Sequence, residues 1–161
     1  MRSKSGFTLV EMVIVIALIA ILSGIAIIGY IKVQSNTRDN TRSADVTVIT
    51  DALERYYAQN GEYPSVRSLV NNYSGNTGTV VAAKLNIATA SLSFPRMPSG
   101  ATNALTSTAP PANDYIVYTA SSTVDNTDCQ SLITGGCGQY TLQYNPETGS
   151  TITITSRHSG G

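Results

Sequence analysis

The stretch GFTLVEMVIVIALIAILSGIAIIGYI, residues 6–31, decides how this chain is built. Residues 12–31 carry no charged side chain, and the short segment before the stretch carries Arg2 and Lys4. A helix of about twenty residues is about 30 Å long, which matches the hydrocarbon thickness of a bilayer. A basic flank followed by such a run is how an export signal or an inserted membrane helix begins. The sequence therefore predicts a membrane-embedded helix near its N-terminus.

The composition limits what the rest of the chain can be. A length of 161 residues fits about one domain and excludes a large multidomain enzyme. Ten basic side chains balance ten acidic ones, so the chain lacks the broad basic field that nonspecific nucleic-acid binding needs. Charged residues make up 12%, against about 25% in an ordinary soluble domain. The polar region after Lys32, about 130 residues, is long enough for one modest core.

Two ordinary readings of the N-terminus each leave a feature unexplained. A cleaved signal peptide could end at residues 24–26 (GIA), giving a mature chain that starts at Ile27, but its apolar region would normally span only about 7–15 residues. A plain membrane anchor leaves Glu11 unexplained, because a carboxylate costs about 2.5–3.5 kcal/mol at the centre of a membrane helix and less near its end. Glu11 therefore requires a partner or a favourable position near the positive end of the helix dipole.

The residues GFTLVE at 6–11, followed by the apolar run, resemble the class III signal of type IV pilins and of the pseudopilins of type II secretion. The resemblance implies that a membrane peptidase and methyltransferase cuts after Gly6 and methylates Phe7. It also implies that Glu11 of an incoming subunit pairs with the Phe7 amine of its neighbour during assembly. A charge pair in a low-dielectric bundle sets the register, because any slip leaves both charges unpaired.

The same resemblance implies partners and a location. The partners are further copies of the chain in a helical filament, the processing enzyme, and the platform and motor proteins of pilus assembly. Before assembly the chain is expected to span the cytoplasmic membrane once, with the leader inside, the head outside and lipid around the helix. After assembly it is expected in an extracellular filament.

Helical periodicity continues beyond the apolar stretch. Apolar or aromatic side chains recur at spacings of three and four, at Val46, Ile49, Leu53, Tyr56 and Tyr57. Residues 59–61 (QNG) are a plausible helix stop, and Pro64 follows. The predicted organisation is a leader at 1–6, a hydrophobic helix at 7–31, its amphipathic continuation at 32–60 and a globular head at 61–161.

The head is predicted to combine short helices with late strands. Short helices are predicted at 65–72, with Ser65 as cap, and at 79–90, while the proline-containing region 91–113 is predicted to be a loop. Strand patterns occur at 115–120, 139–144 and 151–155. The predicted fold is α+β, a long N-terminal α-helix packed on a C-terminal antiparallel β-sheet of three or four strands. A type IV pilin-like fold is also what the resemblance implies.

Cys129 and Cys137 are the two cysteines of the chain. In a reducing compartment they would be unrelated thiols or a weak metal pair, whereas in an exported head a disulfide is favoured. The pair is similar to the cysteine-bounded loop near the C-terminus of many pilins, which is a subunit contact surface in that family.

The sequence does not predict an enzyme, a cofactor or a metal site. His158 is the single histidine and is interpreted as part of the C-terminal tail. The serine-nucleophile motif Gly-x-Ser-x-Gly is absent. Asp125, Asn126 and Asp128 do not complete a calcium-loop pattern and are interpreted as solvated loop residues.

Three further patterns carry little functional weight. The triplet at 72–74 (NYS) is a formal glycosylation sequon, which often arises by chance. Tyr30, like Tyr56 and Tyr57, is assigned to helix packing rather than to electron transport. Lys32, Arg38 and Arg42 form a basic cluster that could contact lipid headgroups, or DNA if the filament serves uptake, although Asp39 and Asp45 dilute its charge. None of these three patterns decides the function.

The function predicted from these observations is structural. A pilin that serves adhesion, motility or DNA uptake is favoured over a pseudopilin, because the cysteine pair is pilin-like and no calcium loop is complete. Residues 60–64 (NGEYP) point slightly toward the pseudopilins. The alternative from another class is a secreted or membrane-anchored binding module whose N-terminus serves only for export.

Overall fold

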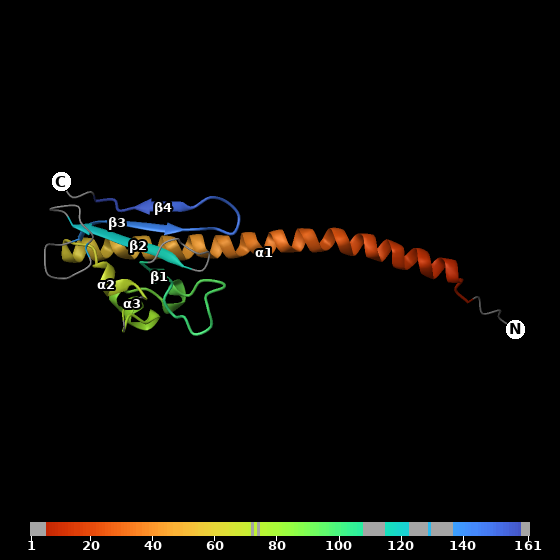
Figure 1. Ribbon diagram of the computed structural model, residues 1–161, viewed down its shortest axis with the longest axis horizontal. Helices are drawn as coiled ribbons and strands as arrows, with labels where there is room; N and C mark the ends of the chain where they lie inside the picture. Colours follow the sequence, from red (N-terminus) through yellow and green to blue (C-terminus); the bar gives the residue numbers. More distant parts are fainter. Residues whose placement is uncertain are drawn as a thin grey trace. The chain divides into compact units, whose positions relative to one another are not determined.

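The computed structural model describes residues 6–71, 73, 75–107, 115–122, 129 and 137–158, the side chains of residues 26–28 excepted. The chain divides into two compact units, Met1–Thr37 and Arg38–Gly161. The first unit contains the apolar part of helix α1. The second, which we call the head, contains the rest of α1 and all the described strands (Figure 1).

Helix α1, Leu9–Asn60, is the longest element of the protein. Residues 12–31 of the helix contain no proline and, apart from Ser23, no short polar side chain that could compete for the backbone, so helical hydrogen bonding continues from one turn to the next. The helix ends where Gly61 adopts the left-handed conformation, with φ of 75°, and donates its N–H to the Tyr57 carbonyl at 2.7 Å. This is a glycine cap, as residues 59–61 predicted.

The head contains short helices and a four-stranded sheet. Helix α2 spans Val66–Leu69, helix α3 Gly78–Leu85 and the 3-10 helix η1 Thr89–Leu92. The strands are β1 (Leu105–Thr106), β2 (Ile116–Ser122), β3 (Cys137–Tyr144) and β4 (Ile152–Thr155), in the order β1-β2-β3-β4. The predicted α+β architecture with strands near 115–120, 139–144 and 151–155 is confirmed.

One face of the sheet forms the core with the second half of α1. Val46, Ile49 and Leu53 of α1 belong to the same buried cluster as Tyr118 of β2 and Leu142 of β3. Burial alternates along β3, which is expected of a strand with one covered face. The hydrophobic periodicity of the helix thus predicted the side that packs on the sheet.

The sheet is mixed rather than wholly antiparallel. β2 pairs with β3, and β3 with β4, in antiparallel fashion, but β1 pairs with β2 in parallel. β1 lies in the region 91–113 that the sequence predicted to be a loop. A strand of two residues is too short to show alternation in the sequence, so its existence depends on its partner Ile116–Val117.

The short helices also differ from the prediction. The helix expected at 79–90 ends early, because Asn86 takes the left-handed conformation with φ of 52° and closes α3. The helix expected at 65–72 is a single turn, and Ser65 stands before it without a capping hydrogen bond from its side chain. The hydroxyl of Ser65 is buried and has no hydrogen-bond partner among the described residues.

Candidate processing and assembly site

The N-terminal end of α1 holds the predicted processing residues Gly6 and Phe7. Residues 6–8 are not helical, and α1 begins at Leu9. The Phe7 side chain is 82% exposed. The Gly6–Phe7 peptide bond therefore lies in non-helical backbone, directly before the first turn of the helix.

Glu11 and Thr8 form a reciprocal helix cap. The Glu11 carboxylate accepts the Thr8 backbone N–H at 2.7 Å and the Thr8 hydroxyl at 2.8 Å. In return, the Thr8 hydroxyl accepts the Glu11 backbone N–H at 3.3 Å. This arrangement is a capping box, whose sequence signature is Thr-x-x-Glu. The predicted site residues did not include Thr8, although this signature could have identified it.

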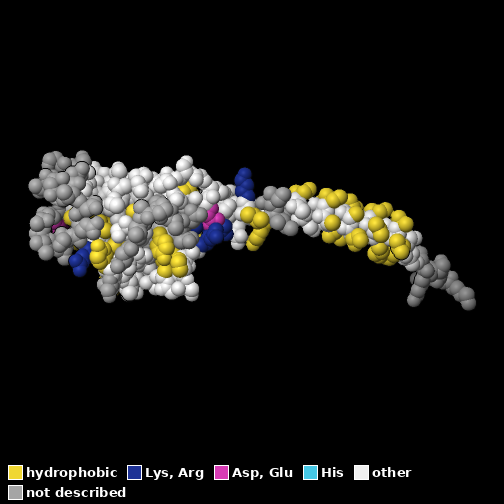
Figure 2. Space-filling model, viewed as in Figure 1, with side chains coloured by type: hydrophobic (Ala, Val, Ile, Leu, Met, Phe, Trp, Pro, Cys, Tyr) yellow, Lys and Arg dark blue, Asp and Glu magenta, His cyan; other side chains and the backbone are white. Residues whose placement is uncertain are grey.

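The apolar part of α1 is exposed in the single chain. The described large apolar side chains from Phe7 to Val33 are 48–82% exposed. Figure 2 shows them as a hydrophobic surface over this end of the helix. Within α1, an 18-residue window reaches a mean hydropathy of 3.0, so the helix is long and apolar enough to cross a membrane. An exposed apolar surface of this kind marks a site of contact with a membrane or with another protein surface.

Arg38 and Arg42, two of the three residues of the basic cluster predicted on α1, are neutralised inside the head. Glu147, from the turn between β3 and β4, accepts hydrogen bonds from Arg38 Nε at 2.6 Å and from Arg42 Nη2 at 3.1 Å. Arg42 is fully buried and also donates to Asp39 at 2.7 Å. Asp39 in turn accepts the backbone N–H of Glu147 at 2.8 Å. We call this set the neck cluster. Because Arg42 is buried in it, Arg42 is not available to lipid or DNA.

His158 lies in the segment after β4, consistent with its interpretation as part of the C-terminal tail, and its ring packs on α1. Its Nδ1 lies 3.2 Å from a Glu54 carboxylate oxygen, and its ring stacks on Tyr57 with the centroids 4.5 Å apart. Glu54 also accepts the Tyr63 hydroxyl at 2.9 Å and the Tyr140 hydroxyl at 3.0 Å. No local pattern marked Glu54, because its partners are distant in sequence.

The electrostatics of Glu54 follow from these donors. Burial raises the pKa of a carboxyl group, but the hydrogen bonds from the Arg157 backbone N–H and from the two tyrosines outweigh it and lower the pKa of Glu54. Burial, together with the hydrogen bond that each donates to the Glu54 carboxylate, raises the pKa of Tyr63 and of Tyr140. Glu54 is therefore ionised at neutral pH and holds the segment after β4 against α1.

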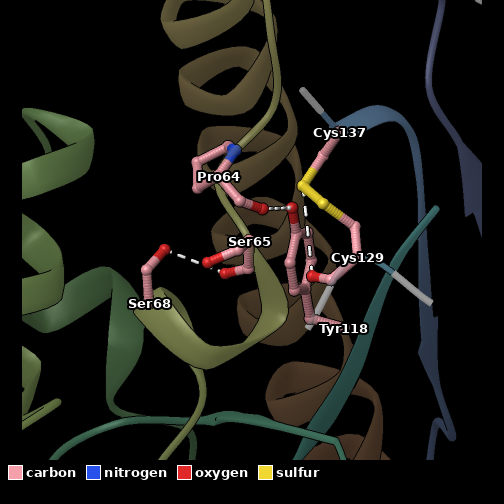
Figure 3. The surroundings of a disulfide bond; sticks show 6 residues. All are labelled: Pro64, Ser65, Ser68, Tyr118, Cys129 and Cys137. Carbon is pink, nitrogen blue, oxygen red and sulfur yellow. Dashed lines mark hydrogen bonds between the residues drawn. A yellow bond between two sulfur atoms is a disulfide. The ribbon is translucent and has the colours of Figure 1, made fainter. Parts of the chain in front are cut away.

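A disulfide joins Cys129 and Cys137 in the structure (Figure 3). The Cys137 carbonyl accepts the Tyr63 N–H at 2.7 Å, and the Cys129 carbonyl accepts the Val66 N–H at 3.1 Å. The Tyr118 hydroxyl donates to the Pro64 carbonyl at 2.6 Å. The disulfide is thus tied to the segment that connects α1 with α2, a link that the sequence did not reveal.

Some predicted residues lie outside the described part of the chain. They are Asp125, Asn126 and Asp128, interpreted as solvated loop residues, and Asn72 and Ser74 of the sequon.

Tyr30 lies in the exposed part of α1. Tyr57 packs against Tyr63, with the ring centroids 4.6 Å apart.

Comparison with known proteins identifies the N-terminal segment. Residues 1–27 match the family described as "Prokaryotic N-terminal methylation motif". No solved structure matches the chain.

Similar curated proteins are pilus and secretion components. The chain is 29% identical over 47% of its length to the type II secretion system core protein G of Pseudomonas aeruginosa. It is 33% identical over 36% of its length to the type IV major pilin protein PilA of Myxococcus xanthus. It is 29% identical over 58% of its length to the type IV wide pilus major component PilA4 of Thermus thermophilus.

These matches cover 56%, 26% and 64% of the relatives, so the chain spans less than two thirds of each relative's length. The methylation motif, the named relatives and the long helix joined to a sheet nevertheless agree with one another. The motif and the named relatives support the resemblance of the chain to the type IV pilins and the related pseudopilins.

Proposed function

We propose that this protein is a structural subunit of an extracellular type IV pilus, assembled through its N-terminal helix. The observation that carries the proposal is the exposed apolar surface of α1 directly behind the Gly6–Phe7 bond. The described head has its own buried core, so this surface is not needed to fold the head. It requires lipid before assembly and neighbouring helices in the filament.

Cleavage after Gly6 and methylation of Phe7 are part of the proposal. A Cβ atom added at Gly6 would meet nothing within 4 Å. The fold of the chain therefore does not demand glycine at this position, which favours an external partner, the peptidase, as the source of the requirement. Cleavage would remove Arg2 and Lys4 and would create an α-amino group on Phe7 that is largely cationic at neutral pH.

Glu11 is proposed to pair with the Phe7 amine of a neighbouring subunit. In the single chain its carboxylate is already bound to Thr8 by the capping box, at 2.7 and 2.8 Å. The capping box explains how Glu11 is tolerated at the start of an apolar helix, because it satisfies two donors at the positive end of the helix dipole. A carboxylate accepts more than two hydrogen bonds, so the cap does not prevent pairing with an amine.

The experiment that tests this role uses Glu11→Gln. A capping box accepts either glutamate or glutamine at the position of Glu11, so the variant keeps the helix cap and removes only the charge. We expect Glu11→Gln to be cleaved after Gly6 normally and to yield at least tenfold fewer filaments in the sheared fraction. Asp51→Asn, an exposed carboxylate of the head, is the matched control and should assemble normally. Wild-type filament yield from Glu11→Gln would refute the pairing role.

A pseudopilin of type II secretion is the second candidate. It is favoured by the match to core protein G, which covers 47% of this chain, whereas the cysteine loop and the two pilin relatives favour the pilus. Deletion of the gene separates the two. A pilin deletion removes surface filaments and the adhesion, motility or DNA uptake that depends on them. A pseudopilin deletion leaves exported proteins inside the cell.

A further inference from the structure

The head contains a polar pocket that the proposed assembly role does not use. It has a volume of about 280 Å³ and lies between the loop from α2 to α3 and the loop that precedes β1. Figure 1 shows α2 and α3 on the side of α1 away from β4. This volume is close to the lower end of the range for small-molecule pockets, so the pocket has room for about one sugar ring.

The lining of the pocket is polar and uncharged. It contains asparagine amides, including Asn71, threonine hydroxyls at Thr77 and Thr102, glycine backbone and one aromatic ring, Tyr73. None of the described lining residues is acidic or basic. A phosphate, a carboxylate or a metal cation would therefore leave its charge unpaired there, which is costly. A neutral ligand that is rich in hydroxyl groups matches the Thr77 and Thr102 hydroxyls and the Asn71 amide.

Two asparagines hold the pocket in shape. Asn103 is 2% exposed, and its side-chain amide donates to the Leu69 carbonyl at 2.7 Å and to the Asn76 carbonyl at 3.0 Å. The Asn76 amide donates to the carbonyls of Arg67 and Val70 at 2.8 and 2.9 Å. These bonds fix the backbone on both sides of the pocket, and a preformed site loses less entropy on binding.

Gly78 shows how closely the two loops approach. A Cβ atom at Gly78 would overlap the backbone carbonyl of Thr102, so only glycine permits this contact. The Gly78 N–H donates to the Thr102 hydroxyl at 3.1 Å. The Thr77 hydroxyl accepts the Val80 N–H at 3.4 Å. Both hydroxyls act as acceptors in these bonds, so each keeps its own proton to donate to a ligand.

Tyr73 supplies the apolar contact that such a ligand needs. Its ring is half-buried, and the Arg67 guanidinium lies 5.4 Å from the ring centroid, which holds the ring in place. A pyranose presents hydroxyl groups at its edge and C–H groups on its face. An aromatic ring beside amides and hydroxyls suits both kinds of surface.

We propose that this pocket binds one residue of a neutral saccharide. The pocket lies within the head unit, and its lining shares no residue with the apolar surface of α1 or with the neck cluster. A subunit could therefore bind sugar whether it serves in a pilus or in a secretion complex, and the proposal does not depend on the proposed function.

The test is saturation-transfer difference NMR on the full chain in detergent micelles. The probes are glucose, galactose, mannose and N-acetylglucosamine, with N-acetylneuraminic acid as the charged comparison. We expect a saturable signal from at least one neutral sugar. Ala101→Leu, which fills the pocket, should weaken binding at least tenfold. Thr79→Leu, an exposed position of α3 outside the lining, is the matched control and should bind as the wild type does.

A second variant guards against misfolding of Ala101→Leu. Tyr73→Leu keeps apolar contact with the core but removes the ring, and it too should bind at least tenfold more weakly at an unchanged melting temperature. The proposal is overturned if no neutral sugar gives a saturable signal. It is also overturned if binding survives in a folded Ala101→Leu or Tyr73→Leu variant, or if only the acidic sugar binds.

Discussion

Glu147 fixes the turn between β3 and β4 to α1 through the arginines of the neck cluster. Its side chain is 9% exposed and contacts Arg38, Arg42 and, at 3.6 Å, Arg96. Arg42 is fully buried, so its charge depends on Glu147 and Asp39 for compensation. Removing one partner of a buried ion pair costs more than the pair itself contributes, because a buried charge is left uncompensated.

The first prediction concerns Glu147→Gln. The substitution keeps the shape of the side chain and removes the charge opposite the arginines. We expect it to lower the free energy of unfolding of the head by about 3 kcal/mol, the low end of the range for breaking a buried ion pair, because Asp39 still balances Arg42. Urea unfolding followed by tyrosine fluorescence measures the effect. Asp51→Asn removes the exposed pair with Arg157 and should cost less than about 0.5 kcal/mol.

The neck cluster also predicts how stability depends on pH. The hydrogen bonds from Arg38 lower the pKa of Glu147 from its ordinary value of 4.5 to about 2, and Arg42 adds to the effect against the opposing influence of burial. A pKa that is lower in the folded state stabilises the fold fully above the unfolded value. That contribution should therefore disappear as the pH falls from about 4.5 to about 2.

Urea midpoints measured at several pH values between 6 and about 2 check this dependence. The wild type should lose stability more steeply than Glu147→Gln over that interval. Asp39 contributes in the same direction, because hydrogen bonds from Glu147 and Thr148 overcome burial and lower its pKa. Parallel curves for the wild type and Glu147→Gln would show that Glu147 is not the titrating group.

Among single residues, the sequence identified those whose role depends on near neighbours. Gly6, Phe7 and Glu11 belong to one short motif, and the Thr8 cap could be read from the same six residues. Glu54 and Glu147 could not be identified in this way. Their partners lie up to about a hundred positions away, as with Tyr140 for Glu54 and Arg38 for Glu147. Such pairs exist only after the sheet has packed on α1.

The same distinction holds for helices and strands. α1, β2, β3 and β4 were predictable because each is long enough to show a helical or alternating pattern. β1 was not, because a strand of two residues shows no alternation. The bridge between Tyr63 and Cys137 was not, because its two residues are distant in sequence. The cysteines indicated a disulfide, but not that it holds the connection from α1 to α2.

This position of the disulfide gives a prediction at the level of elements. Replacing both Cys129 and Cys137 with serine should lower the free energy of unfolding by about 2–3 kcal/mol, as expected for a short closed loop. Hydrogen exchange at the Tyr63 and Val66 amides should also become faster, because their acceptors are the two cysteine carbonyls. The Val81 amide, which donates to the Thr77 carbonyl at the start of α3, is the control. Unchanged exchange at Tyr63 and Val66 would contradict the assigned link.

At the scale of the whole molecule, the protein combines a folded head with an apolar helical segment whose described side chains are exposed. The head needs no second copy to bury its core, whereas Phe7 and the apolar residues up to Val33 remain exposed in the single chain. This asymmetry is the physical reason to expect an assembly that buries the helices and displays the heads.

Gly6→Leu tests the step that would release the helix for assembly. The bulky side chain should block cleavage and leave the precursor in the membrane fraction. Gly24→Ala is the matched control, because Gly24 also has nothing within 4 Å of an added Cβ atom. It should be processed normally. Cleavage of Gly6→Leu at the wild-type rate would show that the peptidase does not require Gly6.

The most direct test of the account is the mass and the N-terminal residue of the mature protein. Both would be measured on the membrane fraction and on material sheared from the cell surface. We predict that the sheared material contains a chain that begins at methylated Phe7. A chain that begins at Met1 or Ile27, and that is missing from the sheared material, would contradict it and would indicate an anchored or secreted binding module instead.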